Sequence, residues 1–393
     1  MKTFLVHLFV MVFSMNISHA QQLNLDSLWN LWNDTTKTDI NRLKAIHKIA
    51  WNGFLFSQPD SAFYFAQIEY DFAESINNKI WMASALNTQG TSLVTRANYD
   101  DALLYYNKAL EFFIDLNNKR GIANSYNYIG IVYHNKGNYE TSLQYHQKSL
   151  NIKEKIGDKG LIETSLNNIA SIYYYQKNYE QTLLYLNKAM EIKKGSNDNQ
   201  GLARLYYNIG LVSYELGNNE RALDYCFIAI SNYEKLENKF GISESYNTIG
   251  NVYMNISNDE KALSFFKKAL EIKKEIGDKA GIANSMENIG SIYRKNGDYN
   301  KALSYLLEAK SIKKEIGTIE HYDVVTKGLY EIYKKLGNNK KALEMHELYM
   351  ETKDSIAKMN AEEELYKFEI DKEYQLKKQA DSIENANAVM IQK

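Results

Sequence analysis

Cysteine and proline are nearly missing from this chain of 393 residues, which contains one of each. The single cysteine, Cys226, excludes an intramolecular disulfide and any zinc site built from several cysteines. One proline together with many Asn, Lys and Tyr residues suggests a bacterial protein.

Neither sign of charge dominates, because 47 Lys and Arg residues face 48 Asp and Glu residues, which gives a formal net charge of −1. Binding to a nucleic-acid backbone needs clustered Lys and Arg that release counterions, and no basic block is present. We therefore expect no nucleic acid among the partners.

Sequence motifs of catalysis are also missing. The chain has no HExxH, no Walker loop and no GxGxxG, and none of its seven histidines pairs with a carboxylate at a spacing that suits a metal. We predict that the protein is not an enzyme and has no catalytic residues, no metal site and no cofactor.

The first twenty residues have the layout of an export signal. Lys2 precedes the apolar run from Phe4 to Phe13, and Ser18-His19-Ala20 follows. The run is too short for a membrane-spanning helix, and nothing after Gln21 approaches the roughly twenty apolar residues that a span needs. We predict a signal peptide at 1–20, cleaved after Ala20, a lead segment at 21–40, no membrane span in this chain, and a periplasmic or extracellular location.

What the chain does contain is a repeat of forty residues. GIANSYNYIG at 121–130 returns as GIANSMENIG at 281–290, and an Ile followed by Gly or Ala recurs every forty residues between them without a gap. A fixed period indicates a stack of similar units rather than separate globular domains. Seven units cover 81–360 and a degenerate eighth covers 41–80. Tyr330 replaces the recurrent glycine, which marks 321–360 as a capping unit.

Each unit is predicted to be a pair of helices. In the unit 121–160, Ile122, Tyr126, Ile129 and Tyr133 have the spacing of one helical face. Gly137-Asn138 is suited to a left-handed cap, and a second helix should run from about Tyr139 to Gly157. Such a pair cannot bury its apolar faces alone, so the pairs must stack.

Glycine returns in the middle of the first helix at positions 90, 130, 210, 250 and 290. Because glycine costs about 1 kcal/mol in a helix relative to alanine, its recurrence predicts an opposing ring or backbone that leaves no room for a side chain. Cys226 lies in the second helix, in the column of Phe266 and Leu306, and is expected to be a buried, unreactive residue.

The columns resemble those of the tetratricopeptide repeat family, whose pattern is met in one unit by Tyr126, Ile129-Gly130, Tyr133, Gly137-Asn138-Tyr139, Ser142, His146 and Ser149. The resemblance covers 41–360. The period is longer than usual and resembles the long repeats of kinesin light chains and Leu-Gly-Asn-rich spindle-orientation proteins. The proline that often closes family repeats is absent, so helix ends should depend on glycines such as Gly157, Gly277 and Gly317.

The resemblance implies an all-α fold: a right-handed α-solenoid, or superhelix, of about eight forty-residue helix-turn-helix repeats plus a C-terminal helix. It also implies that the first helices line a concave groove that binds a protein or peptide partner. The candidate groove residues, carried over by repeat phase, are Asn87, Asn124, Asn127, His134, Asn135, Asn167, Tyr174, Arg204, Tyr207, Tyr214, Asn247, Asn251, Asn284, Arg294 and Lys295.

One groove column is a ladder of asparagines, which we call the asparagine column: Asn87, Asn127, Asn167 and Asn247. An amide offers both donors and acceptors, so the column suits the backbone of an extended peptide. In the alternative interpretation these amides bond to neighbouring helices or water. Arg204, Arg294 and Lys295 are the cations among them that suit a peptide's terminal carboxylate.

The last segment, 361–393, is charged and has no Gly or Pro, which predicts a helix. Leu376, Ile383 and Met390 are seven residues apart, a coiled-coil spacing that leaves a dimer through this helix open. The segment resembles the connector of exported bacterial sensor proteins with tetratricopeptide repeats. We predict a non-enzymatic, extracytoplasmic interaction scaffold. The alternative is the sensory ectodomain of a membrane-bound histidine kinase, cyclase or transcription regulator that lacks its effector part.

Overall fold

The computed structural model describes residues 24–194, 198–319 and 321–391, and every regular element in these ranges is a helix. The predicted all-α fold is thereby confirmed. The predicted signal peptide lies outside the described residues. By contact the described part divides into an N-terminal unit around residues 24–192 and a C-terminal unit around residues 193–373.

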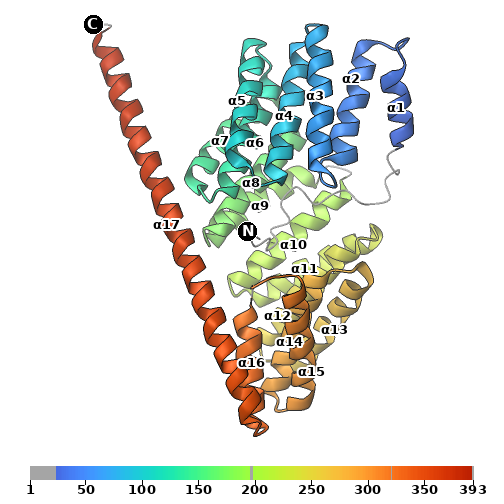
Figure 1. The fold of residues 1–393 in the computed structure, drawn as a ribbon, viewed down its shortest axis with the longest axis vertical. Helices are drawn as coiled ribbons and strands as arrows, with labels where there is room; N and C mark the ends of the chain where they lie inside the picture. Colours follow the sequence, from blue (N-terminus) through green and yellow to red (C-terminus); the bar gives the residue numbers. More distant parts are fainter. Residues whose placement is uncertain (1–23, 195–197, 320, 392–393) are drawn as a thin grey trace. The chain divides into compact units, whose positions relative to one another are not determined.

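The N-terminal unit contains helices that pack in chain order, each against the one before it (Figure 1). They are α1 (Leu25–Asn33), α2 (Asp39–Lys48), η1 (Ile49–Phe54), α3 (Pro59–Ser75), α4 (Lys79–Thr95), α5 (Tyr99–Asp115), α6 (Lys119–Asn135), α7 (Tyr139–Ile156), α8 (Lys159–Tyr175) and α9 (Tyr179–Lys193). The degenerate unit predicted at 41–80 is the pair formed by α2 with η1, a π-helical turn, and α3.

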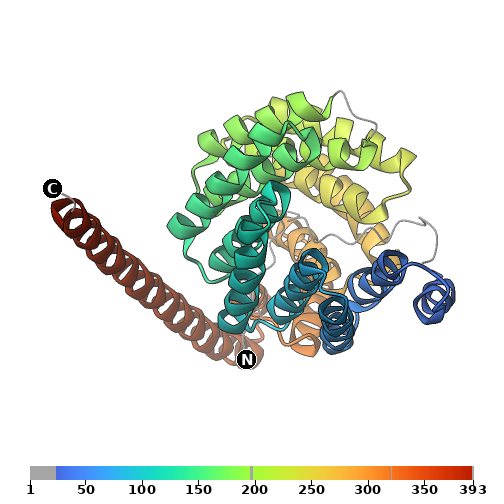
Figure 2. The same ribbon diagram turned by 90° about the horizontal axis from the view of Figure 1, so that it is seen from above.

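The C-terminal unit repeats the same arrangement, which Figure 2 shows from a second direction. Its helices are α10 (Asn199–Glu215), α11 (Asn219–Lys235), α12 (Lys239–Asn255), α13 (Asp259–Ile276), α14 (Lys279–Lys295), α15 (Tyr299–Glu315), α16 (Tyr322–Lys335) and α17 (Asn339–Ile391).

The forty-residue period sets the helix boundaries directly. Helices α4, α6, α8, α10, α12 and α14 each begin forty residues after the previous one, from Lys79 to Lys279. An Asn or Asp precedes each of them, and its side chain accepts a hydrogen bond from a backbone N–H in the first turn, as in Asn118 with Gly121 at 3.0 Å. These caps satisfy donors that a helix start otherwise leaves free. The repeated Asn or Asp therefore fixes where each hairpin begins.

Helix ends use backbone in the left-handed region. Gly157, Gly277 and Gly317 have φ of 77°, 72° and 68°, which confirms the predicted glycine endings. Ala97, Lys177 and Ser257, which lie in the column of Gly137, also have positive φ, at 57°, 57° and 60°. The left-handed conformation is therefore fixed by the position in the repeat. It occurs in this column even where the residue is not glycine and its side chain disfavours a positive φ.

The recurrent glycines have no room for a side chain, as predicted. A Cβ atom on Gly130 would lie 2.9 Å from the His146 ring, and the matching partners in other hairpins are Tyr106 for Gly90, Cys226 for Gly210, Phe266 for Gly250 and Leu306 for Gly290. Cys226 is fully buried, and burial raises the pKa of its thiol to about 12. The prediction of a buried cysteine is confirmed.

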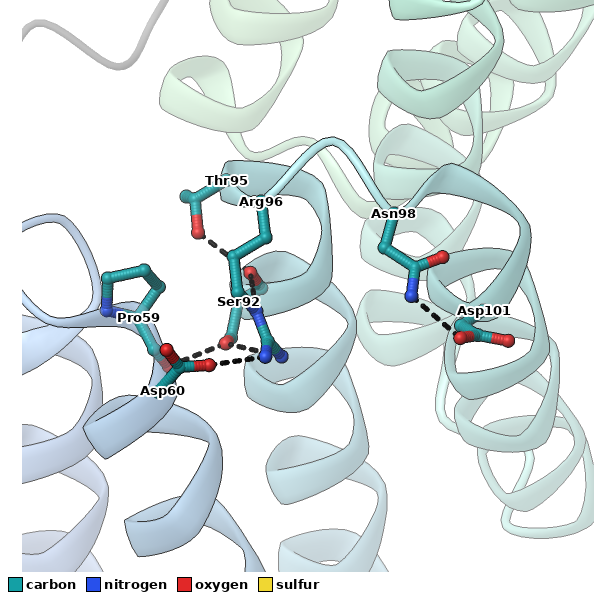
Figure 3. A network of polar contacts seen from close by, with 7 residues as sticks. All are labelled: Pro59, Asp60, Ser92, Thr95, Arg96, Asn98 and Asp101. Carbon is teal, nitrogen blue, oxygen red and sulfur yellow. Dashed lines mark hydrogen bonds and ion pairs between the residues drawn. The ribbon is translucent and has the colours of Figure 1, made fainter. Parts of the chain in front are cut away.

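Neighbouring hairpins are also joined at their turns, as Figure 3 shows for α3 and α4. The Arg96 guanidinium pairs with Asp60, and Ser92 Oγ donates to the carbonyl oxygen of Pro59 at 2.6 Å. Lys136 makes the corresponding pair with Asp100 at 2.7 Å one repeat later. In the same figure, Asn98 donates to Asp101 within its own helix start.

The last pair differs from the others. Gly328, two residues before the expected column, approaches the preceding hairpin, and a Cβ atom there would lie 2.9 Å from Leu306 Cδ1. The second helix of the predicted capping unit and the predicted C-terminal helix form one element, α17, which runs from Asn339 to Ile391 without a break (Figure 1). Among the described helices, none is both long and apolar enough to cross a membrane.

Candidate functional site

All candidate groove residues lie on first helices of the pairs. By helix they are Asn87 on α4; Asn124, Asn127, His134 and Asn135 on α6; Asn167 and Tyr174 on α8; Arg204, Tyr207 and Tyr214 on α10; Asn247 and Asn251 on α12; and Asn284, Arg294 and Lys295 on α14. Because each helix begins forty residues after the one before, residues of one column hold the same position on successive first helices.

Asn127 is bonded within the protein. Its side-chain oxygen accepts a hydrogen bond from Asn168 Nδ2 at 2.9 Å and lies 3.1 Å from His146 Nδ1. Burial lowers the pKa of His146 to about 3, so the ring is neutral and donates through Nδ1. This amide therefore links α6 to α7 and α8, the role that the alternative interpretation gave to the whole column.

The other three members of the asparagine column differ from Asn127. The side-chain oxygens of Asn87, Asn167 and Asn247 are buried and have no hydrogen-bond partner among the described residues. Asn167 uses its amide nitrogen to donate to Glu163 Oε1, which leaves only its oxygen unmatched. A buried acceptor without a donor costs about 1 to 3 kcal/mol, so a ligand N–H that these oxygens meet after a turn of the amide would remove that penalty.

His134 is less accessible than the sequence led us to expect. Its side chain is 8% exposed and packs edge-on against Tyr139 and Tyr175, with ring centroids 5.4 and 4.9 Å away. Burial lowers the pKa of His134 to about 4. The ring belongs to an aromatic cluster at the turn edge of the hairpins, whereas Tyr174 and Asn135 are only partly buried.

Tyr207 interrupts the asparagine column for a packing reason. It is 3% exposed and lies in an apolar cluster with Ala203, Ala229 and Tyr233. Arg204, Tyr214, Asn247, Asn251 and Asn284 are partly buried. The predicted groove face is therefore apolar around Tyr207 on α10 and more polar on α12 and α14.

Arg294 and Lys295, which were proposed for a peptide carboxylate, pair with acidic side chains of the protein. Arg294 pairs with Glu331, and Lys295 Nζ lies 2.9 Å from Asp259 Oδ1. A peptide carboxylate would therefore have to compete with Glu331 and Asp259 for these two cations, and their use by a ligand stays a prediction.

Sequence reasoning missed a column of buried lysines on the second helices, which we call the buried lysine column: Lys153, Lys193, Lys273 and Lys313, with exposures of 1%, 8%, 2% and 1%. Lysine is usually a surface residue, so its forty-residue recurrence did not stand out. A usable signal was present, because Glu244 and Glu287 hold groove positions in the same repeats as Lys273 and Lys313.

A cavity of about 500 Å³ lies between α3, α4 and α5, lined by Gln67, Tyr70, Leu86, Gln89, Tyr105, Lys108, Glu111, Phe112 and Asp115. Two residues of α4, Leu86 and Gln89, line this cavity. At 100° per residue, their mean direction lies about 130° around the helix axis from the direction of Asn87. The cavity is therefore not part of the asparagine column. In the part of the chain that the structure covers, no group of three or more His, Cys, Asp or Glu side chains is placed to hold a metal ion.

Comparison with known proteins agrees with this architecture. A tetratricopeptide repeat family model matches four overlapping stretches, 121–195, 161–226, 201–275 and 241–315. None of the curated proteins compared with the chain matches it.

Several solved structures share the fold. The STAND protein with a tetratricopeptide repeat sensor, PH0952 from Pyrococcus horikoshii, has 17% identity and a TM-score of 0.64, over 87% of this chain and 54% of that one. The apo quorum sensor NprR from B. thuringiensis has 13% identity and a TM-score of 0.60, over 84% and 97%.

A third similar structure is the Rap conjugation gene regulator of the plasmid pLS20 in complex with the Phr* peptide, with 16% identity and a TM-score of 0.52, over 85% and 96%. At these identities the likeness concerns the fold alone. Together with the four family-model matches and the helix pairs that continue the same period on either side of them, it shows that the chain belongs to the tetratricopeptide repeat family.

Proposed function

We propose that the protein is a non-enzymatic scaffold that binds an extended peptide, or an extended segment of a partner protein, along its first helices. The observation that carries this proposal is the set of unmatched side-chain oxygens at Asn87, Asn167 and Asn247, which recur in one column of the repeat. The backbone of an extended peptide carries N–H groups at regular intervals and can supply the missing donors whatever its side chains are.

One of the similar structures supports a peptide as the ligand, because it was solved with the Phr* peptide. Another is described as a quorum sensor. Each stacks helix pairs over most of the length of this chain, which makes the same mode of binding a reasonable inference for it.

Capture from a random peptide library tests the proposal. The variant carries Asn87→Ala, Asn167→Ala and Asn247→Ala, which removes the unmatched acceptors and leaves Asn127 and its internal hydrogen bonds intact. The control carries Asn107→Ala, Asn151→Ala and Asn187→Ala, three exposed asparagines of second helices.

The wild type and the control should capture the same peptides, and the variant should capture about tenfold less, as expected when several hydrogen bonds to a ligand are lost. Equal capture by the variant and the wild type would remove the proposal, provided that both melt as folded helical proteins in circular dichroism.

We further propose that the protein is exported and acts outside the cytoplasm, on the basis of the export signal at 1–20. Edman sequencing of the protein purified from its native cell tests this, with Gln21 as the expected first residue. An intact Met1 would contradict export through a cleaved signal.

The continuous helix α17 favours a second candidate, the sensory ectodomain. A single helix runs without a break from Asn339, in the last repeat, to Ile391, and such a helix would transmit a change in the repeat along its axis. Light scattering of the purified chain would show whether α17 also joins two copies. An in-frame hydrophobic span in the gene downstream of Lys393 would favour the sensor, and an immediate stop codon would favour the scaffold.

A further inference from the structure

Three members of the buried lysine column have a carboxylate supplied by the protein itself. Lys273 Nζ lies 2.7 Å from Glu244 Oε1, and Lys193 Nζ lies 2.6 Å from Asp198 Oδ2. Lys313 Nζ lies 3.2 Å from Glu287 Oε2. Burial of an ammonium group costs free energy of desolvation unless an opposite charge lies beside it. In these three pairs the carboxylate offsets that cost.

The partner residues on the first helices hold fixed repeat positions. Glu244 lies in the column of Asn124, and Glu287 lies in the column of Asn127. Lys313 also donates to Asn284 Oδ1 at 2.9 Å, which is again the column of Asn124. In these two hairpins the lysine of the second helix thus reaches first-helix positions of the predicted groove.

Lys153 is the exception. It is 1% exposed, and its ammonium donates to Ser165 Oγ at 2.9 Å, but no carboxylate of a described residue lies within ion-pair distance of it. The positions that hold Glu244 and Glu287 in later repeats are Asn124 and Asn127 here, and neither is charged. Burial accordingly lowers the pKa of Lys153 to about 8.

Nearby acids do not substitute for the missing partner. The charge of Asp158 acts on the pKa of Lys153 from a distance, but the two residues form no ion pair. The Asp158 carboxylate pairs with Arg120 instead. Its side chain also caps α8 by accepting from Leu161 N at 3.2 Å. Its carboxylate is therefore held at the helix start and does not reach the ammonium.

We propose that Lys153 is the docking point for a carboxylate group of the peptide ligand, which occupies the place that Glu244 and Glu287 fill in two later repeats. This inference rests on the proposed peptide-binding function and adds a requirement for the ligand: it carries a carboxylate, either at its C-terminus or on an Asp or Glu side chain. Asn124 is partly exposed and holds the first-helix position at which Glu244 meets Lys273, so its amide N–H₂ can donate to a carboxylate that enters at that position.

The site differs from the cations that the sequence pointed to. Arg294 and Lys295 lie on a first helix and pair with Glu331 and Asp259. Lys153 lies on a second helix, and no carboxylate of a described residue lies within ion-pair distance of it.

Two variants test the assignment. Lys153→Met keeps the unbranched stem and removes the ammonium. Asn124→Glu supplies an internal carboxylate in the arrangement that Glu244 and Lys273 already have, and it keeps the lysine, so it remains informative if Lys153→Met folds poorly. Lys155→Met, an exposed lysine of the same helix, is the matched control.

The probes are three synthetic decapeptide libraries. The first lacks Asp and Glu and ends in a free carboxylate; the second is the same library with an amidated end; the third is amidated and contains one Asp or Glu per peptide. We expect the wild type and Lys155→Met to retain the first or third library about tenfold better than the second, as expected for one charge-assisted hydrogen bond. The first library identifies a terminal carboxylate and the third a side-chain carboxylate.

Lys153→Met and Asn124→Glu should lose this preference while still retaining peptides through the asparagine column. Asn124→Glu should also melt at a higher temperature than the wild type. A wild type without preference, or a preference that both variants keep, overturns the assignment of Lys153 and leaves the peptide proposal standing. A wild type that retains none of the libraries overturns both.

Discussion

Gly250 and Phe266 approach so closely that a Cβ atom on Gly250 would lie 2.6 Å from Phe266 Cε1. Sixteen residues separate the two, and the same separation recurs between Gly90 and Tyr106 and between Gly290 and Leu306. These three hairpins are therefore closed at an equivalent point by a large side chain that packs on the glycine backbone.

Gly250→Ala should consequently destabilise the protein by about 1 to 3 kcal/mol, because overpacking outweighs the gain in helix propensity. Gly160 is the control, since a Cβ atom there would meet only Asp158 Oδ1 at 3.6 Å. Gly160→Ala should be neutral or stabilising by up to about 1 kcal/mol. Urea unfolding followed by circular dichroism measures both, and equal stabilities of the two variants would contradict the packing argument.

In the column of Gly137, where the backbone is left-handed, glycine is expected to stabilise the protein and a side chain to destabilise it. Lys177 and Ser257 have φ of 57° and 60°, a conformation that side chains disfavour. Lys177→Gly and Ser257→Gly should each stabilise by about 1 kcal/mol, and Gly217→Ala, at φ 74°, should destabilise by a similar amount. Melting temperatures that move in the reverse directions would show that the turns do not set stability.

Lys153 should make the stability of the protein increase with pH in the alkaline range. Burial lowers its pKa from 10.5 to about 8, so below pH 8 the folded protein bears the full cost of a buried charge. As the pH rises from about 8 to about 10.5, the folded state releases this proton before the unfolded state does, and stability increases. Lys153→Met should therefore be more stable than the wild type at pH 7, on the order of 1 to 3 kcal/mol.

This difference should shrink as the pH approaches 10. Comparison of the two proteins by urea unfolding at pH 7, 8.5 and 9.5 cancels the other titrating groups. A difference that stays constant or grows with pH would mean that the ammonium is not desolvated.

The Cys226 thiol should be inert in the folded protein, because burial keeps it protonated and out of reach of reagents. Ellman's reagent at pH 8 should label none of it in the native state and one thiol per chain in guanidinium chloride. Rapid labelling without denaturant would indicate that α11 opens easily.

The sequence was sufficient for most of the fold because the period is regular. Asn118, Asn138 and Gly157 mark the start of two helices and the end of one, and the same columns repeat these marks along the chain. The period also carried information that we did not use: Ala97, Lys177 and Ser257 share the column of Gly137, and this predicts their positive φ.

The unbroken α17 follows from the same columns. Second helices end where a left-handed residue occurs in the column of Gly157, but that position is Ala357 in the last unit, and Lys358 replaces the capping Asp158. Without either residue, the helix has no signal to stop.

The candidate site was harder to predict, because pairings between helices decide it. Nothing in the local sequence shows that Arg294 meets Glu331, that Asn127 is held by Asn168, or that lysines of second helices lie beneath the first-helix face. Each of these contacts joins residues about 30 to 40 positions apart, and only the packing of helices against one another brings them together.

Equilibrium binding of one library-selected peptide tests the central claim most directly. The peptide, labelled with fluorescein, would be titrated with the wild type, with the Asn87, Asn167 and Asn247 triple alanine variant, and with the Asn107, Asn151 and Asn187 control, and anisotropy would be recorded. We predict that affinity falls about tenfold or more in the triple variant and is unchanged in the control. An unchanged affinity in the triple variant would show that the ligand does not use the asparagine column.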